Sequence, residues 1–460
     1  MILMNGKKKC NKNIILITID SLRADHLHCM GYPKSITPTI DRLAKNGLLF
    51  TNAISNAPYT PYSIPSFISS NLPPLHGKIR HTIAQVLKNY GYKTAAFNPN
   101  TIIFSDTYEG CDISNGFDIY DLMLDYNKRC MLTLSFLRME LMKYFRLKFN
   151  EDNLIYKIVY NFYNKIIKIF PEIFSPKDYN YVPNAESINN RAIDWIKNQK
   201  NRFFLWLHYM DVHQPYAPID YKNKKELFYL ISKYRDFPNM LNEEEVKKLI
   251  NLYDLEIKYV DKAINKFLTK LKEENHLENT IIIISADHGE AFDEHGALGH
   301  GGQFRVQLYD EYIKVPLVIW GLEKRGVIDR QVQLLDLAPT ICDLINIPIH
   351  PNFFGKSYFK ISSEGTIITS EFDIAYRTKN YKLIIKKSNK EKNELYDLKN
   401  DPHERNNIYN NHKIMKKLRY NLLSLIKKYK NKDKLIKINV NNKIKYPNNK
   451  FYYSTNIFFK

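Results

Sequence analysis

The 460-residue chain contains few cysteines, and their pattern limits the environment and the kind of metal site that the protein can have. The five cysteines are scattered and odd in number, without the spacing of a thiolate metal site. They are Cys10, Cys29, Cys111, Cys130 and Cys342. This pattern argues against a disulfide scaffold and predicts reduced thiols in a cytoplasmic protein.

Long apolar runs are also missing from the chain. No apolar stretch reaches the length of about 18 residues that a membrane-spanning helix needs. The first apolar run, 14–19, is short and ends at Asp20, so it predicts a buried strand and not a signal peptide. We therefore expect a cytoplasmic protein, with any membrane contact limited to its surface.

Acidic residues are too few to balance the basic ones, and the formal net charge is +20. Much of the excess lies in residues 411–460, which contain 14 lysine and arginine residues and a single acid, Asp433. A basic end of this kind binds nucleic acid, anionic lipid or an acidic polymer, or is only solvated. No nucleic-acid motif accompanies it. Peripheral membrane contact through the basic segments and a solvated end both stay open.

Short apolar runs alternate with amphipathic segments, which predicts an α/β fold built on one large, mostly parallel sheet flanked by helices. The expected strands are 14–19, 48–53, 93–97, 203–209, 280–285 and 315–319. The expected helices are 37–47, 82–90, 186–198 and 249–274. We assign 1–356 to this catalytic domain, 357–428 to a smaller C-terminal α+β subdomain with strands at 366–369 and 382–386 and a helix at 414–428, and 429–460 to a basic tail.

Residues 121–180 differ in character from the rest of the predicted catalytic domain. They are rich in Leu, Met, Phe, Tyr, Lys and Arg, and their apolar residues recur at helical spacing. This pattern predicts an insertion of two or three amphipathic helices. The insertion either packs on the main domain or lies on a membrane surface.

Polar side chains follow three of the expected strands. Asp20 ends the first strand, His213 follows the strand at 203–209, and Asp287 and His288 follow the strand at 280–285. The carboxyl ends of parallel strands meet at one edge of a sheet, where ligands bind. Carboxylates, an imidazole and a hydroxyl there form an oxygen and nitrogen site, which suits Mn²⁺, Ca²⁺, Mg²⁺ or Zn²⁺.

Ser63 is the candidate for the attacking hydroxyl. Pro61 and Pro65 restrict the backbone on both sides of it, and the run after Pro65 predicts a helix. Ser63 would then precede a helix N-terminus, where free N–H groups favour an anion. The alternative is a proline-rich turn in which Ser63 is only an N-cap.

The histidines divide into candidates for the site and candidates for the core. His213 and His300 could hold substrate oxygens or protonate a leaving group, because imidazole changes charge near neutral pH. Together with Asp211 they are also candidate ligands of a second ion. His208 lies inside a strand and is predicted to be a satisfied core histidine, and His295 is predicted to be a loop residue.

Nine short motifs, in order along the chain, resemble the sulfatase family of the alkaline-phosphatase-like superfamily. They are N-I-I-L-I-T-I-D-S-L-R-A-D-H at 13–26, T-P-T-I-D-R-L-A-K-N-G at 37–47, S-I-P-S at 63–66, L-P-P-L-H-G at 72–77, M-D-V-H-Q-P-Y at 210–216, S-A-D-H-G-E at 285–290, L-Y-D-E-Y-I-K-V-P-L-V-I at 308–319, L-D-L-A-P-T at 335–340 and E-L-Y-D-L-K-N-D-P-H-E at 394–404. The resemblance spans roughly residues 13 to 410. It leaves the helical insertion and the basic tail unaccounted for.

The resemblance implies an alkaline-phosphatase-like parallel-sheet domain with a small C-terminal α+β subdomain and one divalent metal ion. Ca²⁺ or Mn²⁺ is the first expectation, with Zn²⁺ or Mg²⁺ as alternatives. The implied metal site consists of Asp20, Ser63, Asp287 and His288. Ser63 takes the position of the nucleophile that sulfatases oxidise to formylglycine, whose hydrate attacks sulfur.

The resemblance also concerns His213 and His300, and the chain departs from the family pattern at two named positions. His213 resembles a substrate contact, and His300 falls where many members have a sulfate-binding lysine. Phe67 stands where the nucleophile motif has an arginine, which argues against formylglycine at Ser63. Ser21 replaces the second of two adjacent metal-binding aspartates, and the usual Lys-x-His pair has no clear match.

The sequence therefore predicts a sulfatase-like, metal-dependent sulfuric ester hydrolase, with calcium as one expected metal. Attack would come from residue 63, on an anionic ester such as a sulfated glycan or small molecule. One alternative is a phosphodiester or phosphonate monoester hydrolase, or a phosphotransferase, that uses unmodified Ser63, since Asp-His at 287–288 also occurs in such relatives. Another is a catalytically degenerate member that binds an anionic glycan or a membrane. The oligomeric state is not specified.

Overall fold

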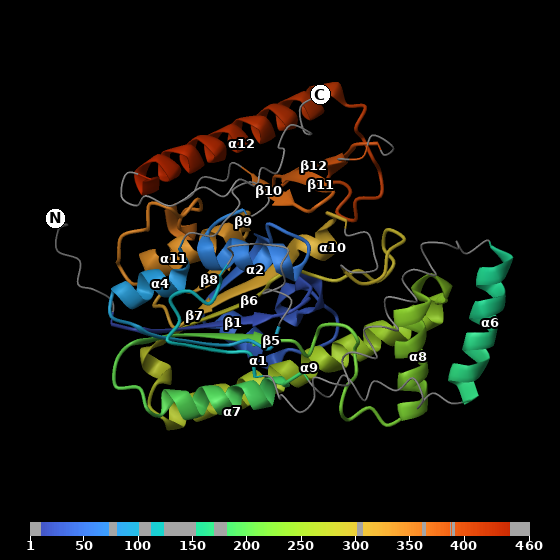
Figure 1. Ribbon diagram of the computed structural model, residues 1–460, viewed down its shortest axis with the longest axis horizontal. Coiled ribbons are helices and arrows are strands. Elements are labelled where there is room, and N and C mark those ends of the chain that lie inside the picture. Colours follow the sequence, from blue (N-terminus) through green and yellow to red (C-terminus); the bar gives the residue numbers. More distant parts are fainter. Residues whose placement is uncertain are drawn as a thin grey trace.

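The structure is a computed structural model that describes residues 11–72, 81–100, 112–123, 153–169, 182–300, 307–360, 365–386, 388 and 392–441. Two sheets organise these residues, one of nine strands and one of four. Helices cover both faces of the larger sheet, and a long helix covers the smaller one (Figure 1). Cys29 and Cys342 are free thiols, and the other three cysteines lie outside the described residues.

The large sheet has the strand order β4-β3-β5-β1-β6-β7-β2-β8, and β9 pairs with β2. The strands are β1 (Asn13–Ile19), β2 (Leu48–Ile54), β3 (Lys93–Phe97), β4 (Ile119–Asp121), β5 (Phe203–Tyr209), β6 (Thr280–Ala286), β7 (Lys314–Trp320), β8 (Gly326–Ile328) and β9 (Val332–Gln333). The strands from β4 to β6 along this order are parallel, as predicted. β7 runs antiparallel to both β6 and β2, because the chain enters β7 from the edge at which β6 ends, without a crossover.

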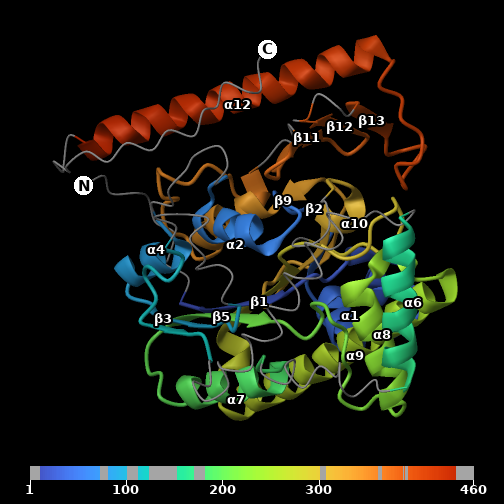
Figure 2. The same cartoon turned by 45° about the vertical axis from the view of Figure 1, so that its right-hand side comes forward.

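Helices cover both faces of the large sheet (Figure 2). One face carries α1 (Pro38–Lys45), α7 (Ala185–Ile196) and α9 (Glu243–Glu273), and the other carries α2 (Thr60–Ser69), α4 (Ile83–Asn89) and α11 (Leu337–Leu344). Every residue of β1, β5 and β6 is buried, which explains their unbroken apolar sequences. α9 begins before the predicted residue 249, because Asn242 and Glu245 form a capping box at its start.

α2 begins at Thr60, so the prediction of a helix that starts after Pro65 is wrong. Tyr59 has an extended backbone and is the N-cap, and the Ser63 amide donates to its carbonyl at 3.1 Å. Pro61 is tolerated because the first amides of a helix have no intrahelical partner. Ser63 therefore lies inside the first turns of α2 and is not an N-cap.

The small sheet is antiparallel, in the order β10 (Thr366–Thr369), β11 (Asp373–Arg377), β12 (Tyr381–Lys386), β13 (Glu394–Asp397). α12 (His412–Asn441) packs on it through a buried stripe at helical spacing, Leu418, Leu422, Ile426 and Tyr429. The helix continues beyond its predicted end at 428, because neither glycine nor proline interrupts it. Part of the predicted basic tail is thus helical, and residues 442–460 lie outside the described part of the chain.

A buried ion network joins the small sheet to α10 (Asp310–Ile313), the short helix that leads into β7. Lys382 Nζ lies 2.6 Å from Asp310 Oδ1 and 2.7 Å from Glu404 Oε1, and the Lys382 side chain is fully buried. Arg377 pairs with the other oxygen of Asp310 at 2.6 Å. Burial alone would raise the pKa of Asp310, but these two cations hold it well below its usual range.

The helical insertion is described only at 121–123 and in α6 (Leu154–Ile169), and the rest of it lies outside the described residues. Tyr156, Tyr160 and Tyr163 of α6 pack on Phe237, which follows α8 (Lys224–Asp236). This part of the insertion therefore packs on the main domain. Within the described ranges, no helix combines the length and the apolarity needed to cross a membrane.

Candidate active site

Asp20, Asp287 and His288 come together at the carboxyl edge of the large sheet, as predicted. β1 and β6 are parallel neighbours whose last residues, Ile19 and Ala286, pair with each other, so the residues that follow them lie side by side. One ligand atom from each of the three side chains lies within 4.8 Å of the others, and all three side chains are buried. This group is a candidate metal site.

The hydrogen bonds of this group leave electron pairs that face one another. His288 Nδ1 lies 2.7 Å from the Gly289 carbonyl, so Nδ1 carries the proton and Nε2 presents its lone pair to the group. Nε2 lies 3.5 Å from Asp287 Oδ2 and 3.6 Å from Asp20 Oδ1. Asp287 Oδ2 is buried and has no hydrogen-bond partner among the described residues. Two carboxylates and an imidazole lone pair that converge in this way fit a divalent cation.

Asp20 is oriented by a buried chain of hydrogen bonds that begins at Trp206. The indole N–H donates to Thr18 Oγ1 at 2.9 Å, and this hydroxyl lies 2.8 Å from His208 Nδ1. The Asp20 carboxylate can only accept, so His208 Nε2 carries the proton that reaches Asp20 Oδ2 at 3.2 Å, and Nδ1 faces the Thr18 hydroxyl. His208 is a satisfied core histidine, as expected, and in addition it holds Asp20 in place.

Asp20 also receives hydrogen bonds from two residues that the sequence reasoning did not identify. Asn100 Nδ2 donates to Asp20 Oδ2 at 3.2 Å, and the Thr60 hydroxyl donates to the same oxygen at 3.3 Å. Asn100 follows the carboxyl end of β3, which was the available signal. Burial alone would raise the pKa of Asp20, but three nearby imidazoles hold it well below its usual range.

The two hydroxyls of α2 differ in what they contact. Thr60 Oγ1 lies 3.0 Å from His288 Nε2 as well as 3.3 Å from Asp20 Oδ2. Ser63 Oγ is buried and has no hydrogen-bond partner among the described residues. Residues three apart share a helix face, so Ser63 lies one turn beyond Thr60 on the side of α2 that faces the site.

His213 and His300 lie beside the candidate metal site, as predicted, and form a second group with Asp20 within 4.8 Å. Their rings are nearly perpendicular, with centroids 4.8 Å apart. Glu290 lies 3.0 Å from His300 Nδ1 and accepts a hydrogen bond from Tyr216 at 2.6 Å. Burial alone would lower the pKa of His300, but the Glu290 carboxylate raises it to about 9. His300 is therefore a cation at neutral pH.

Asp211 and His295 lie outside these groups. The Asp211 carboxylate accepts the Ala185 backbone N–H at 3.0 Å, at the start of α7, so its prediction as a ligand of a second ion is wrong. Burial raises the pKa of Asp211 to about 7. His295 belongs to the loop after β6, as expected, where it stacks on Tyr309 and lies 2.6 Å from Glu311.

Ser21 connects the two carboxylates although it carries no charge. Its backbone has φ of 61°, in the left-handed region that non-glycine residues rarely adopt. In this conformation its hydroxyl donates to Asp20 Oδ1 at 2.8 Å and its amide donates to Asp287 Oδ1 at 3.2 Å. Tyr253 donates to its carbonyl at 2.8 Å. Ser21 therefore fixes the relative position of two candidate ligands.

Comparison with known proteins identifies the family. The family model described as Sulfatase matches residues 12–347, and the one described as N-sulphoglucosamine sulphohydrolase, C-terminal, matches residues 367–432. The chain belongs to the sulfatase family. An arylsulfatase of Clostridium perfringens is 23% identical to this sulfatase-family chain over 475 residues, which cover 92% of the chain and 95% of that protein. These matches indicate a sulfuric ester hydrolase.

Solved structures confirm the alkaline-phosphatase-like fold of this sulfatase-family chain. A structure of BT4656 in complex with its substrate D-glucosamine-2-N,6-O-disulfate has a TM-score of 0.65 and 16% identity, with coverage of 93% of this chain and 98% of that one. The phosphonate monoester hydrolase of Agrobacterium radiobacter has a TM-score of 0.62 and 18% identity, with coverage of 91% and 96%. The predicted fold class is therefore confirmed.

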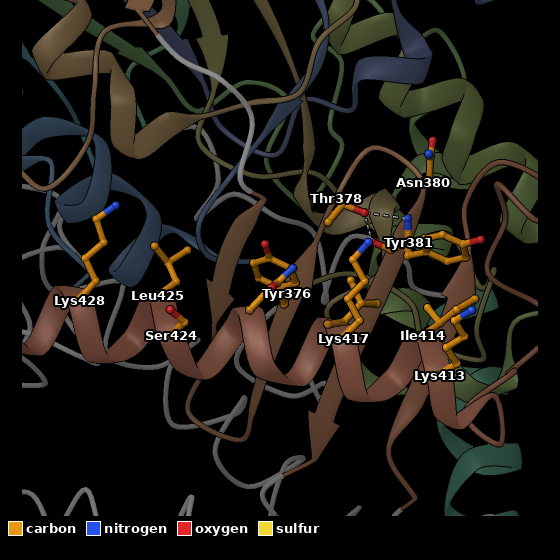
Figure 3. A pocket seen from close by; sticks show the side chains of 12 residues that line it. Tyr376, Thr378, Asn380, Tyr381, Lys413, Ile414, Lys417, Ser424, Leu425 and Lys428 are labelled. Carbon is orange, nitrogen blue, oxygen red and sulfur yellow. Dashed lines mark hydrogen bonds between the residues drawn. The ribbon is translucent and has the colours of Figure 1, made fainter.

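A separate cavity of about 720 Å³ lies between α12 and the small sheet (Figure 3). Lys413, Lys417 and Lys428 line it together with Tyr376 and Tyr381, and the lining contains no carboxylate. The three lysines lie on one face of α12, because spacings of 4 and 11 residues return to the same side of a helix. The cavity is basic and shares no residue with the candidate metal site.

Proposed function

We propose that this protein hydrolyses sulfate esters of sugars with the help of one divalent metal ion. The observation that carries the proposal is the convergence of the side chains of Asp20, Asp287 and His288. One oxygen of this group, Asp287 Oδ2, has no hydrogen-bond partner among the described residues. A bound cation would activate a hydroxyl and offset the charge of the ester oxygens. The sulfatase-family match supports the ester class.

In this proposal the chain's own residues supply the remaining chemistry. A hydroxyl of α2 attacks sulfur, and Ser63 is the position that the family resemblance suggests. His300 is cationic and lies beside the candidate ligands, so it would hold an anionic ester oxygen. His300 also carries the proton that the departing alcohol needs, and His213, whose pKa burial lowers, would contact the ester as a neutral imidazole beside it. Glu290 positions His300 by the hydrogen bond to its Nδ1.

Two observations support a sugar as the substrate. A structural neighbour is described in complex with its substrate D-glucosamine-2-N,6-O-disulfate, and the C-terminal family match carries the description N-sulphoglucosamine sulphohydrolase. The basic cavity under α12 is lined by three lysines, a composition that suits further anionic groups of a glycan chain.

Because Ca²⁺ and Mn²⁺ both accept carboxylate and imidazole ligands, either ion would suit the site.

Phosphonate monoester hydrolysis is the second candidate function. The phosphonate monoester hydrolase of Agrobacterium radiobacter has the same fold, and Phe67 replaces the arginine associated with the formylglycine motif. A phosphonate monoester carries one negative charge, as a sulfate ester does, and an unmodified hydroxyl attacks phosphorus readily when a metal lowers its pKa.

The test is hydrolysis by the purified full chain after metal removal and after addition of Mn²⁺ or Ca²⁺. The substrates are glucosamine sulfates, para-nitrophenyl sulfate and a para-nitrophenyl phosphonate monoester. We expect metal-dependent release of sulfate, and loss of that activity in Asp287→Asn. Release only from the phosphonate would support the second candidate, and no metal-dependent release from any ester would refute both.

A further inference from the structure

We propose that Thr60, and not Ser63, supplies the oxygen that attacks the ester, an inference that rests on the proposed function. Thr60 is the first residue of α2, and its side chain is buried. Its hydroxyl oxygen is within hydrogen-bond distance of His288 Nε2 and Asp20 Oδ2, the side chains expected to hold the metal. An attacking oxygen must lie beside the ion that would lower its pKa, and the Thr60 hydroxyl lies beside two of the side chains that would hold this ion.

Ser63 makes no such hydrogen bonds in the structure. Its hydroxyl is buried and has no hydrogen bond to Asp20, Asp287, His288 or any other described residue. Three residues along a helix correspond to a rise of about 4.5 Å, which places Ser63 one turn further from the N-terminus of α2. Thr60 is the first residue of α2, at the positive end of the helix dipole, which would favour a developing negative charge there.

The assignment changes the chemistry that is available. A threonine side chain is a secondary alcohol, so it cannot become the aldehyde of formylglycine. Thr60 would attack as an unmodified hydroxyl, as the Oγ1–S or Oγ1–P bond forms and the ester bond breaks. The hydroxyl proton ends on the departing alcohol. Water then attacks the same sulfur or phosphorus atom, which restores the Thr60 hydroxyl and releases the acid anion.

The first experiment traps this covalent intermediate. The protein is mixed with the fastest substrate of the panel, quenched in acid and digested, and the peptide that spans Thr60 and Ser63 is fragmented in a mass spectrometer. We expect one sulfuryl or phosphoryl group on Thr60, and an unmodified Ser63. The group on Ser63, or an aldehyde at Ser63, would overturn the assignment.

Two matched variants on the same helix complete the test. Thr60→Ala should lower kcat by at least about a thousandfold and form no covalent adduct. Ser63→Ala should lower kcat far less and should still form the adduct on Thr60. Thr60→Ser keeps a hydroxyl and should recover part of the rate. Circular dichroism of each variant shows whether it is folded. Equal losses in Thr60→Ala and Ser63→Ala would refute the assignment.

A metal-binding measurement separates failure of this inference from failure of the proposed function. If the wild-type protein hydrolyses none of the esters, the proposed function fails. Calorimetric titration with Mn²⁺ then tests whether Thr60 lies beside the metal ion. Thr60→Ala should then bind Mn²⁺ more weakly than the wild type, and Ser63→Ala should bind it equally well. Unchanged affinity in Thr60→Ala, or a loss confined to Ser63→Ala, would show that Thr60 does not face the ion.

Discussion

Replacing Lys382 by methionine should destabilise the protein more than any surface ion pair can. Lys382 is fully buried between Asp310 and Glu404, and its Nζ also donates to the Leu308 carbonyl at 3.1 Å. Methionine has a similar length but no charge, so Lys382→Met leaves the Glu404 carboxylate buried without its cation. Asp310 keeps Arg377 as its partner. Burial already raises the pKa of Glu404 to about 7, so without Lys382 this carboxylate must either stay charged without a cation or take up a proton, and either outcome costs stability.

The expected loss is about 3–5 kcal/mol in the free energy of unfolding, the range found when one partner of a buried pair is removed. The matched control is Lys379→Met, on the loop between β11 and β12. Lys379 pairs with Asp329, and the side chains of this pair are 54% and 63% exposed. An exposed pair contributes about 0–1 kcal/mol, so the control should unfold almost as the wild type does.

Urea unfolding followed by two signals measures this difference. The three tryptophans, Trp195, Trp206 and Trp320, belong to α7, β5 and β7, so their fluorescence reports on the large sheet. Circular dichroism reports on both sheets. Because the network joins the small sheet to α10 beside β7, we expect both transitions of Lys382→Met to move to lower urea. A loss no larger than that of Lys379→Met would refute the reasoning.

Two further predictions concern Asp336 and His208. Burial raises the pKa of Asp336 to about 7 in the folded protein, above the value of about 3.9 in an unfolded chain, so the stability it contributes is full below about pH 4 and is lost as pH rises through 7. Asp336→Asn still accepts the hydrogen bond from the Lys356 amide. Its free energy of unfolding should therefore be higher than that of the wild type by up to about 4 kcal/mol at pH 8, and equal to it near pH 4. Urea midpoints that differ by the same amount at both pH values would contradict this. His208→Phe removes a hydrogen-bond donor to Asp20 and should weaken Mn²⁺ binding, measured by calorimetry, about 10–100-fold. The control is His276→Phe, away from the site, which should bind Mn²⁺ as the wild type does. Equal affinities in both variants would show that His208 does not position Asp20.

The long buried strands of the large sheet could be predicted because their sequences leave few alternatives. β1, β5 and β6 are unbroken apolar runs that end on polar residues, a pattern typical of parallel strands covered on both faces. The direction of β7 could not be predicted, since an apolar strand of seven residues fits either orientation. The start of α2 at Thr60 was missed because Pro61 and Pro65 were taken as barriers, whereas Pro61 lies in the first turn, where proline is tolerated, and the helix continues through Pro65.

The candidate metal site was predictable where a residue directly follows a strand. Asp20, Asp287 and His288 are fixed to the sheet edge by the chain itself. Thr60 and Asn100 reach the site only through the packing of α2 and of the segment after β3, which local sequence does not encode. Asp211 follows a strand too, but its carboxylate turns to the N-terminus of α7, a choice set by tertiary contacts.

The left-handed backbone of Ser21 has a consequence for how the protein could be improved. A non-glycine residue in that region costs about 1–2 kcal/mol, so Ser21→Gly would relieve strain in the fold. The same change would remove the hydroxyl that donates to Asp20. Selection for thermal stability alone would therefore favour a glycine that loosens the site, whereas selection for activity retains the strained serine. Stability and activity compete at this one position.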